Sequence, residues 1–502
     1  MSKQKILFFL FIVFNEIAFA QTNYTLINPA DTEQDIIRKA ANIRPTQRQL
    51  RWQQLELTTF FHFGVNTFTG REWGTGKEDP NIFNPTELDT EQWMKTVKDA
   101  GFKQVIITAK HHDGFCLWPT KTTNHSVKSS PWKSGNGDVV REVAEACKKY
   151  GLGFGVYLSP WDMNAPMYGT DAYNDFFVDQ LTELLTWYGQ VDEVWFDGAN
   201  GEGPNGKKQV YDFDRWYKLI RKLQPQAVIA IMGPDVRWVG TETGVGREME
   251  WSVLPSDNLD QASIASSSQQ DITFKPMGDM QGSDLGSREK ILKAKGLVWY
   301  PAETDVSIRP GWFYHAEQDD KVKTPKHLND IYYTSVGMNG VLLLNIPPDK
   351  RGLVHEADIK NLQEWTNIRR QTFANNLAKG ARVKGLGFLK RRKLFDGKDG
   401  THYTTRRKAD RATVEFMLQK QATFDVLALQ ENIKLGQRVE KFSAYYDDNG
   451  TWKKFTEGTT IGYKRLLRFD KVTAKKIKLE IESSRLNPYL AEVGLYLQPE
   501  IK

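Results

Sequence analysis

The chain has 502 residues, of which 40% are hydrophobic and 26% charged. This is the composition of an ordinary globular protein, and it excludes a disordered or fibrous chain. The formal net charge of +6 is small for this length and gives no reason to expect a nucleic-acid partner. Aromatic residues make up 12% of the chain and include 15 tryptophans, a content that suits stacking against sugar rings. Cys116 and Cys147 are too few for a disulfide framework and are predicted to be buried free thiols.

The first twenty residues are predicted to be a signal peptide. Lys3 and Lys5 precede an apolar run over residues 6–14, and the Ala-Phe-Ala ending at 18–20 resembles a cleavage site. The apolar run is too short to cross about 30 Å of hydrocarbon as a helix. The alternative is a buried N-terminal strand. We therefore expect an exported protein, periplasmic or secreted, whose mature chain does not insert into a membrane.

From about residue 50 onward, short β-rich runs alternate with amphipathic helical segments. The residues after Asp138 predict a helix that ends at Gly151, with an Asp cap at its start and a glycine at its end. Strand segments are predicted at 58–65, 103–109, 153–158, 193–196, 228–232, 297–300 and 340–346, and an eighth is expected near 250–253. This alternation favours an α/β fold with a (β/α)₈ TIM-like barrel over residues 21–377.

Beyond residue 377 the pattern consists of strands alone. Runs with strand character occur at 412–418, 423–431, 438–446, 464–469 and 475–482, separated by turn residues such as Asp448-Asn449-Gly450. Short strands without helical periodicity predict an all-β sandwich over residues 378–502.

Two segments have no defined role at this point. Residues 257–290 are rich in serine and are predicted to form a long loop over the barrel mouth. Residues 382–411 hold eleven Lys and Arg residues. A solvated basic surface and a binding surface for an anionic glycan both remain open for this segment.

Polar and aromatic residues cluster where the predicted strands end, which is where barrel enzymes build their active sites. Four strand ends carry the runs Phe61-His62-Phe63-Gly64, Lys110-His111-His112-Asp113-Gly114-Phe115, Tyr157-Leu158-Ser159-Pro160-Trp161 and Trp195-Phe196-Asp197-Gly198, and the first is followed by Glu72-Trp73. Such side chains are not needed for packing. Their clustering at one rim predicts a site for binding or chemistry.

Asp197 follows three apolar residues and precedes a glycine, so its carboxylate is expected to project into the barrel mouth. It could cap the following turn, since Asp is a common turn residue, or attack an anomeric carbon as a nucleophile. A retaining glycosidase needs a second carboxyl group about 5 Å away. The candidates are Glu72, Glu242, Glu248, Glu250 and Glu303, and the residues alone do not choose among them.

The adjacent residues His111 and His112, followed by Asp113, also suggest a metal site, since imidazole and carboxylate ligate zinc. Neighbouring residues on a strand point to opposite faces, which argues against a shared ion. A structural role and hydrogen bonding to hydroxyl groups are the other interpretations. We predict no metal and no cofactor.

Taken in order, these motifs resemble those of the α-L-fucosidases of glycoside hydrolase family 29, over residues 50 to about 350. The resemblance implies a TIM-like barrel followed by a galactose-binding, discoidin-like β-sandwich, and it makes Asp197 the nucleophile. Residues 234–242 and 307–314 resemble the branch that acts on branched α-1,3/1,4-fucosides, whose acid/base falls on Glu242. Thr241 departs from that branch, where Asn is expected.

The resemblance implies a retaining exo-α-L-fucosidase that removes terminal α-1,3/1,4-linked fucose from oligosaccharide or glycoconjugate glycans through a covalent fucosyl-enzyme. The substrate-binding residues that it implies are His62, Glu72, Trp73, His111, His112, Tyr157, Trp195, Arg309 and Trp312. Two alternatives remain: a catalytically weak carbohydrate-binding protein on the same barrel, and a metal-dependent hydrolase that uses the histidine pair. A binding protein can lose either carboxyl group of the pair, and this chain keeps both.

Overall fold

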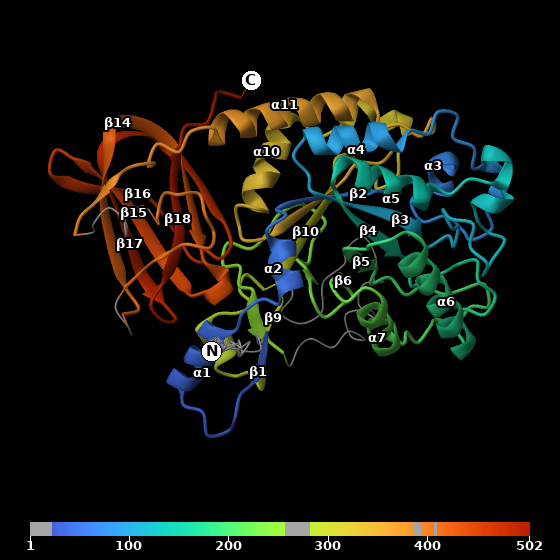
Figure 1. Ribbon diagram of the computed structural model, residues 1–502, viewed down its shortest axis with the longest axis horizontal. Helices are drawn as coiled ribbons and strands as arrows, with labels where there is room; N and C mark the ends of the chain where they lie inside the picture. The colour runs from blue at the N-terminus through green and yellow to red at the C-terminus, as the bar shows by residue number, and fades with distance from the viewer. Residues whose placement is uncertain (1–22, 257–281, 386–392, 406–408, 502) are drawn as a thin grey trace, which may run out of the picture.

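The structure is a computed structural model that describes residues 23–256, 282–385, 393–405 and 409–501. The predicted signal peptide and most of the predicted loop at 257–290 lie outside these residues. The barrel and the antiparallel C-terminal domain lie side by side in Figure 1, with the C-terminal domain in orange and red. Among the described helices, none has the length and apolar character that crossing a bilayer requires.

In the described part of the chain, eight parallel strands form a nearly closed barrel in the order β6-β5-β4-β3-β2-β11-β10-β7. They are β2 (Leu57–Phe61), β3 (Gln104–Lys110), β4 (Gly153–Leu158), β5 (Glu193–Phe196), β6 (Val228–Ile231), β7 (Arg237–Trp238), β10 (Ala302–Ser307) and β11 (Val341–Asn345). An isolated parallel bridge between Ala230 and Val236 brings the two end strands together. The predicted fold class is confirmed.

Helices cover the outside of this barrel (Figure 1). They are α3 (Val65–Thr69), α4 (Thr90–Asp99), α5 (Val139–Tyr150), α6 (Asp171–Trp187), α7 (Phe213–Leu223), α10 (Pro325–Thr334) and α11 (Glu356–Phe373), with α1 (Glu33–Asn42), α2 (Gln47–Gln53) and α9 (Arg288–Ile291) at one end. The Asp138 side chain caps α5 by accepting from Arg141 N–H, and Gly151 ends it in the left-handed conformation, as predicted. Cys116 and Cys147 are separate buried thiols.

Two predicted barrel strands are wrong. The segment at 297–300 corresponds to β9 (Gly296–Trp299), and the strand expected near 250–253 overlaps only the start of β8 (Val253–Pro255). With β1 (Tyr24–Leu26), these two strands form a separate antiparallel sheet. Their places in the barrel are taken by β10 and β7. The apolar run of β9 has the sequence pattern of a buried strand. In contrast, β10 carries polar side chains in the barrel interior and β7 is only two residues long, so neither has a recognisable strand pattern in the sequence.

The C-terminal domain is an antiparallel sheet in the order β13-β18-β14-β17-β15-β16, with β12 paired to β14. Its strands are β12 (Arg382–Val383), β13 (Tyr403–Thr404), β14 (Ala412–Glu431), β15 (Val439–Asp448), β16 (Thr451–Gly458), β17 (Arg465–Ser484) and β18 (Tyr489–Tyr496). The predicted runs at 412–418 and 423–431 are one strand, interrupted by a register shift between Met417 and Ala422. The runs at 464–469 and 475–482 likewise form β17. The prediction of an all-β domain is confirmed.

Candidate active site

A pocket opens where the barrel strands end, at the rim where the motifs cluster. Its empty volume of about 780 Å³ is within the range of about 300–1,000 Å³ usual for small-molecule sites. The residues that line it are Phe60, His62, Trp73, His111, His112, Tyr157, Trp161, Trp195, Asp197, Ala199, Gly201, Glu242, Asp305 and Trp312. The fold therefore gathers all the predicted site residues in one place except Glu72 and Arg309.

Asp197 follows β5 directly, and its two carboxylate oxygens have different partners. Oδ1 accepts from the backbone N–H of Ala199 at 2.7 Å, which is the turn-capping role considered from the sequence. Oδ2 accepts from the hydroxyl of Tyr157 at 3.0 Å and lies 3.9 Å from Nε2 of His112. The side chain remains 27% exposed. One oxygen thus fixes the rotamer, and the other is directed into the pocket.

Glu242 reaches the same pocket from the loop that follows β7. Its Oε2 accepts a hydrogen bond from the indole N–H of Trp312 at 3.2 Å. Glu242 is exposed at the mouth of the pocket. Protein atoms nevertheless surround its carboxyl group and take the place of part of the water around it. Desolvation therefore raises its pKa, the Trp312 hydrogen bond opposes this, and the negative charges of Asp197 and Glu72 raise the pKa further. A carboxyl group with a raised pKa keeps its proton above the ordinary range of a carboxyl group, as a proton donor needs.

The hydrogen bonds of Asn345 determine which ring nitrogen of His62 carries the proton. The Asn345 amide N–H donates to Trp312 O at 2.7 Å, so its Oδ1 faces Nδ1 of His62 at 2.9 Å. An acceptor at that position requires a proton on Nδ1, which leaves Nε2 as an acceptor. Burial lowers the pKa of His62 to about 3, so the ring is neutral.

The same argument applies to His112. The hydroxyl of Ser159 donates to Trp161 O at 2.7 Å, so Nδ1 of His112, 2.7 Å from that hydroxyl oxygen, donates to it. Its Nε2, near Asp197, is left as an acceptor, and burial lowers the pKa of the ring. Two neutral imidazoles thus offer acceptor nitrogens, which suits hydroxyl groups that donate.

Aromatic rings form the walls of the pocket. Tyr157 stacks on Trp195 with ring centres 5.2 Å apart, and Phe60 meets Trp195 edge-on at 5.0 Å. On the other side Trp73 packs edge-on against Trp161 at 5.8 Å and is 56% exposed. Flat apolar faces beside hydrogen-bonding groups suit a ligand that has both an apolar face and hydroxyl groups.

The sequence model of the family described as alpha-L-fucosidase matches residues 28–370, and that of the F5/8 type C domain matches residues 378–492. Alpha-L-fucosidase 1 of Arabidopsis thaliana is 43% identical to this chain over 466 residues, which cover 90% of this chain and 87% of the relative. The chain belongs to the alpha-L-fucosidase family. It is a glycosidase.

Solved structures of the family have the same fold as this fucosidase. A putative alpha-L-fucosidase from Bacteroides ovatus is 52% identical, with a TM-score of 0.85, over 96% of this chain and 78% of that one. The glycoside hydrolase 29 fucosidase of Ruminococcus gnavus in complex with fucose is 34% identical, with a TM-score of 0.79, over 91% of this chain and 96% of that one.

In this fucosidase Glu72 does not line the pocket. Its Oε2 accepts from the backbone N–H groups of Trp312 (2.8 Å) and Phe313 (3.3 Å), and its Oε1 lies 2.6 Å from Nε2 of His315. Glu72 therefore holds the loop that presents Trp312 to Glu242.

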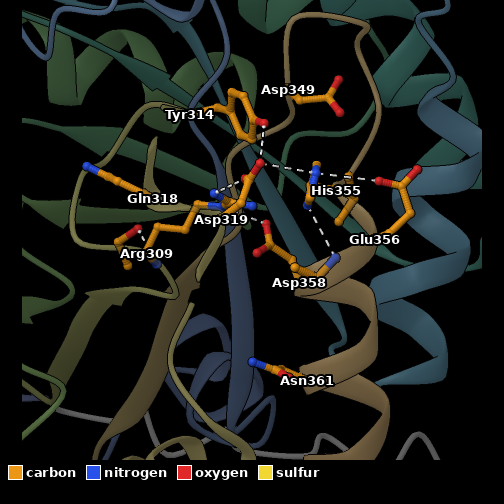
Figure 2. Close-up of polar contacts among 12 residues, drawn as sticks. Arg309, Tyr314, Gln318, Asp319, Asp349, His355, Glu356, Asp358 and Asn361 are labelled. Carbon is orange, nitrogen blue, oxygen red and sulfur yellow. Dashed lines mark hydrogen bonds and ion pairs between the residues drawn. The ribbon is translucent and has the colours of Figure 1, made fainter. Parts of the chain in front are cut away.

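Arg309 is predicted to contact substrate, but in this structure it does not line the pocket. Figure 2 shows its guanidinium directed toward Asp358, at the start of α11, and toward Asp319. These ion pairs measure 3.0 Å and 2.8 Å, and the Arg309 side chain is fully buried. Between Arg309 and Trp312 the chain turns at Pro310-Gly311, so one residue points under α11 and the other into the pocket.

Five pocket residues are absent from the predicted site: Phe60, Trp161, Ala199, Gly201 and Asp305. Phe60 and Trp161 stand in or beside the quoted motifs and could have been included. Asp305 lies on β10, which has no apolar strand pattern, and it accepts from the indole N–H of Trp238 at 2.7 Å. Burial raises the pKa of Asp305 well above its ordinary value, and the nearby Glu242 adds to this. A metal site also has no support in the described ranges, where no three His, Cys, Asp or Glu side chains are arranged to hold an ion.

Proposed function

We propose that this fucosidase is an exo-acting, retaining enzyme that removes terminal α-1,3- or α-1,4-linked fucose from fucosylated oligosaccharides or glycoconjugate glycans. The observation that carries the proposal is the placement of Asp197 and Glu242 in one pocket. Their settings differ: Asp197 is held by a hydroxyl and a backbone N–H, and Glu242 is a carboxyl group with a raised pKa. Such a difference separates a nucleophile from a proton donor.

In the first step, Oδ2 of Asp197 attacks C1 of fucose while Glu242 donates its proton to the glycosidic oxygen. The bond from C1 to that oxygen breaks, the aglycone leaves as an alcohol, and fucose is bound to Asp197 as an ester. Asp197 then has no charge, so it no longer raises the pKa of Glu242. The Glu242 carboxylate takes a proton from water, whose oxygen attacks C1 and releases fucose with its original configuration.

The remaining pocket residues would bind the sugar. Nε2 of His62 and Nε2 of His112 accept protons from fucose hydroxyls, and the stacked faces of Tyr157 and Trp195 form an apolar wall. His111 stacks on Tyr157 with ring centres 5.7 Å apart and lines the same space. Trp73 and Trp312 stand nearer the mouth, where the aglycone lies.

The stereochemistry can be tested by following the reaction by proton NMR from its first minutes. We expect α-L-fucose to appear first and the β anomer only through mutarotation. Initial β-L-fucose would contradict the retaining mechanism.

The linkage proposal is supported by residues 234–242 and 307–314, which resemble the branch acting on branched fucosides. We expect hydrolysis of a Lewis-type trisaccharide and of an aryl α-L-fucoside, but not of 2′-fucosyllactose. Preferential cleavage of 2′-fucosyllactose would contradict the branch assignment.

We also propose that the protein is exported to the periplasm or secreted, on the basis of residues 1–20. N-terminal sequencing of the protein made in its own host should find Gln21 first. A mature chain that still begins at Met1 would contradict export.

A further inference from the structure

The loop that carries Glu242 is closed at its base by buried charges. It leaves the barrel at Arg237, in β7, and returns at Glu250, just before β8. The Arg237 guanidinium forms an ion pair with the Glu250 carboxylate, and both side chains are buried. Arg247 lies 3.5 Å from the other oxygen of the same carboxylate. The position of Glu250 therefore determines where both ends of the loop lie.

Side chains of the C-terminal domain hydrogen-bond to the backbone at the base of this loop. The N–H of Glu250 donates to the hydroxyl of Thr460 at 3.0 Å, and its carbonyl accepts from the amide of Gln437 at 2.9 Å. The oxygen of the Gln437 side chain accepts from the N–H of Ser252 at 2.7 Å. All four residues are buried. A single glutamine thus bridges the two backbone groups as a neighbouring strand would.

Two further bonds extend this contact. Thr459 and Arg465 both donate to the carbonyl of Glu248, each at 2.7 Å. Buried backbone groups need hydrogen-bond partners, and among the described strands none pairs with Glu250 to supply them. Thr460 and Gln437 of the C-terminal domain take that part, together with Asn339 of the barrel, whose amide donates to the Glu250 carbonyl at 3.1 Å.

The barrel holds the other part of the loop. The N–H of Gly244 donates to Asp305 O at 3.2 Å, and the N–H of Gly246 donates to Thr334 O at 2.7 Å. Gly244 packs so closely against α10 that an added Cβ would lie 2.8 Å from Cγ2 of Ile331. Glu242 therefore sits on a loop fixed between the barrel and the C-terminal domain.

We propose that Gln437 and Thr460 are positioning residues for Glu242. The C-terminal domain then helps to hold the acid/base carboxyl group of the barrel in position. The proposal rests on the role of Glu242 given under the proposed function. Loss of either side chain would let the base of the loop shift, and proton transfer to the leaving group would become less efficient. Binding of fucose and attack by Asp197 would change less.

The experiment compares two substrates that differ in their need for an acid. A dinitrophenyl α-L-fucoside has a leaving group that departs without protonation, whereas a Lewis-type trisaccharide does not. For Gln437→Ala and Thr460→Val, we expect kcat/KM on the trisaccharide to fall about tenfold more than on the dinitrophenyl fucoside, a fraction of the effect of about 10²–10⁴ that general acid catalysis supplies. Thr460→Ser, which keeps the hydroxyl group, should restore the ratio.

The matched control is Arg468→Ala on the same domain face. Arg468 pairs with Asp330 of α10 at 2.6 Å and lies over the ring of Tyr333. We expect it to change both substrates equally. Thermal melting of each variant checks that the chain is folded.

Glu242→Ala measured beside them separates the two proposals. If it shows the dependence on leaving group while Gln437→Ala and Thr460→Val do not, the positioning role is wrong and the proposed function stands. If Glu242→Ala shows no such dependence, the acid/base assignment itself is wrong. Equal losses on both substrates for the two C-terminal variants would also overturn the positioning role.

Discussion

Two pairs of carboxyl groups lie inside the same barrel, and their surroundings give them different chemistry. Asp197 and Glu242 line the open pocket at the ends of the strands. Glu193 begins the strand that ends just before Asp197, and Glu303 stands on β10; both are fully buried. Strand β5 therefore leads from a fully buried carboxyl group to one that substrate can reach.

Burial favours the protonated form of both carboxyl groups of the buried pair. Burial raises the pKa of Glu193 to about 8, and raises that of Glu303 well above its ordinary value, with the charge of Glu193 adding to it. Glu193 accepts from the indole N–H of Trp52 at 3.0 Å, and Glu303 from that of Trp195 at 2.7 Å. A raised pKa is therefore shared by a proposed acid and by structural groups, and access to the pocket is what distinguishes Glu242.

The largest expected effect comes from the pocket pair. Asp197→Ala should lower kcat by roughly 10⁴- to 10⁶-fold, the size of effect that follows loss of a nucleophile or its partner in a protease. Azide added to this variant should occupy the space of the lost carboxylate and yield β-L-fucosyl azide, with inverted configuration. The measurements are steady-state rates and NMR of the product. Hydrolysis near the wild-type rate would show that Asp197 belongs with the structural carboxyl groups.

Glu242→Ala should show a smaller loss that depends on the substrate. On the trisaccharide kcat/KM should fall by about 10²–10⁴-fold, because protonation of the leaving group is lost. On the dinitrophenyl fucoside it should fall much less, and azide should give α-L-fucosyl azide. Equal losses on both substrates would contradict the role of acid.

The pH profile of the wild-type enzyme tests the same difference. Because the folded pKa of Glu242 is raised, its protonated form persists above the usual range of a carboxyl group and is lost as pH rises through that pKa. The kcat/KM for the trisaccharide should therefore fall on the alkaline side at a pH above about 4.3, the ordinary pKa of Glu. With the dinitrophenyl fucoside, this alkaline fall in kcat/KM should be absent. An alkaline fall shared by both substrates would point to another group.

Much of the pocket could be predicted because its motifs follow apolar strands. Asp197 comes after Val194-Trp195-Phe196, and the histidines follow β2 and β3 in the same way. Two of the eight barrel strands, β7 and β10, could not be recognised, since β7 is two residues long and β10 places Glu303 and Asp305 inside the barrel where apolar residues are expected. Asp305 was missed for this reason.

The direction of the loop after β10 is a property of tertiary structure. Arg309 and Trp312 stand three residues apart in a segment without regular alternation, and no periodicity says which of them faces the pocket. The buried carboxylate of Asp358 and the partly exposed carboxylate of Asp319 decide it, and both come from later parts of the chain. Gln437 and Thr460, which hydrogen-bond to the loop that carries Glu242, likewise come from a distant part of the sequence.

Glu303 tests whether the buried pair supports the pocket through Trp195. Glu303→Leu leaves the Trp195 indole N–H without its acceptor, a cost of about 1–3 kcal/mol, so we expect KM for fucosides to rise by about tenfold. Glu303→Gln keeps an acceptor oxygen and should change KM little. If the Gln variant instead loses kcat as much as Glu242→Ala, the buried pair takes part in proton transfer and the contrast between the two pairs is wrong.

The smallest effect on activity is expected at Glu193, where the change appears in stability. The folded pKa of Glu193 is about 8, above the unfolded value of about 4.3, so between these values the folded state binds a proton that the unfolded state has lost. The free energy of unfolding must therefore fall as pH rises through this window, by about 1.4 kcal/mol per pH unit for one such group. Glu193→Gln removes the titration and should make the fall in the urea midpoint between pH 5 and pH 8 shallower, with kcat nearly unchanged. Glu289→Gln, at a side chain that is 80% exposed, is the matched control and should keep the wild-type slope. Equal slopes in the Glu193 variant and wild type would mean that the folded state does not hold the extra proton on Glu193.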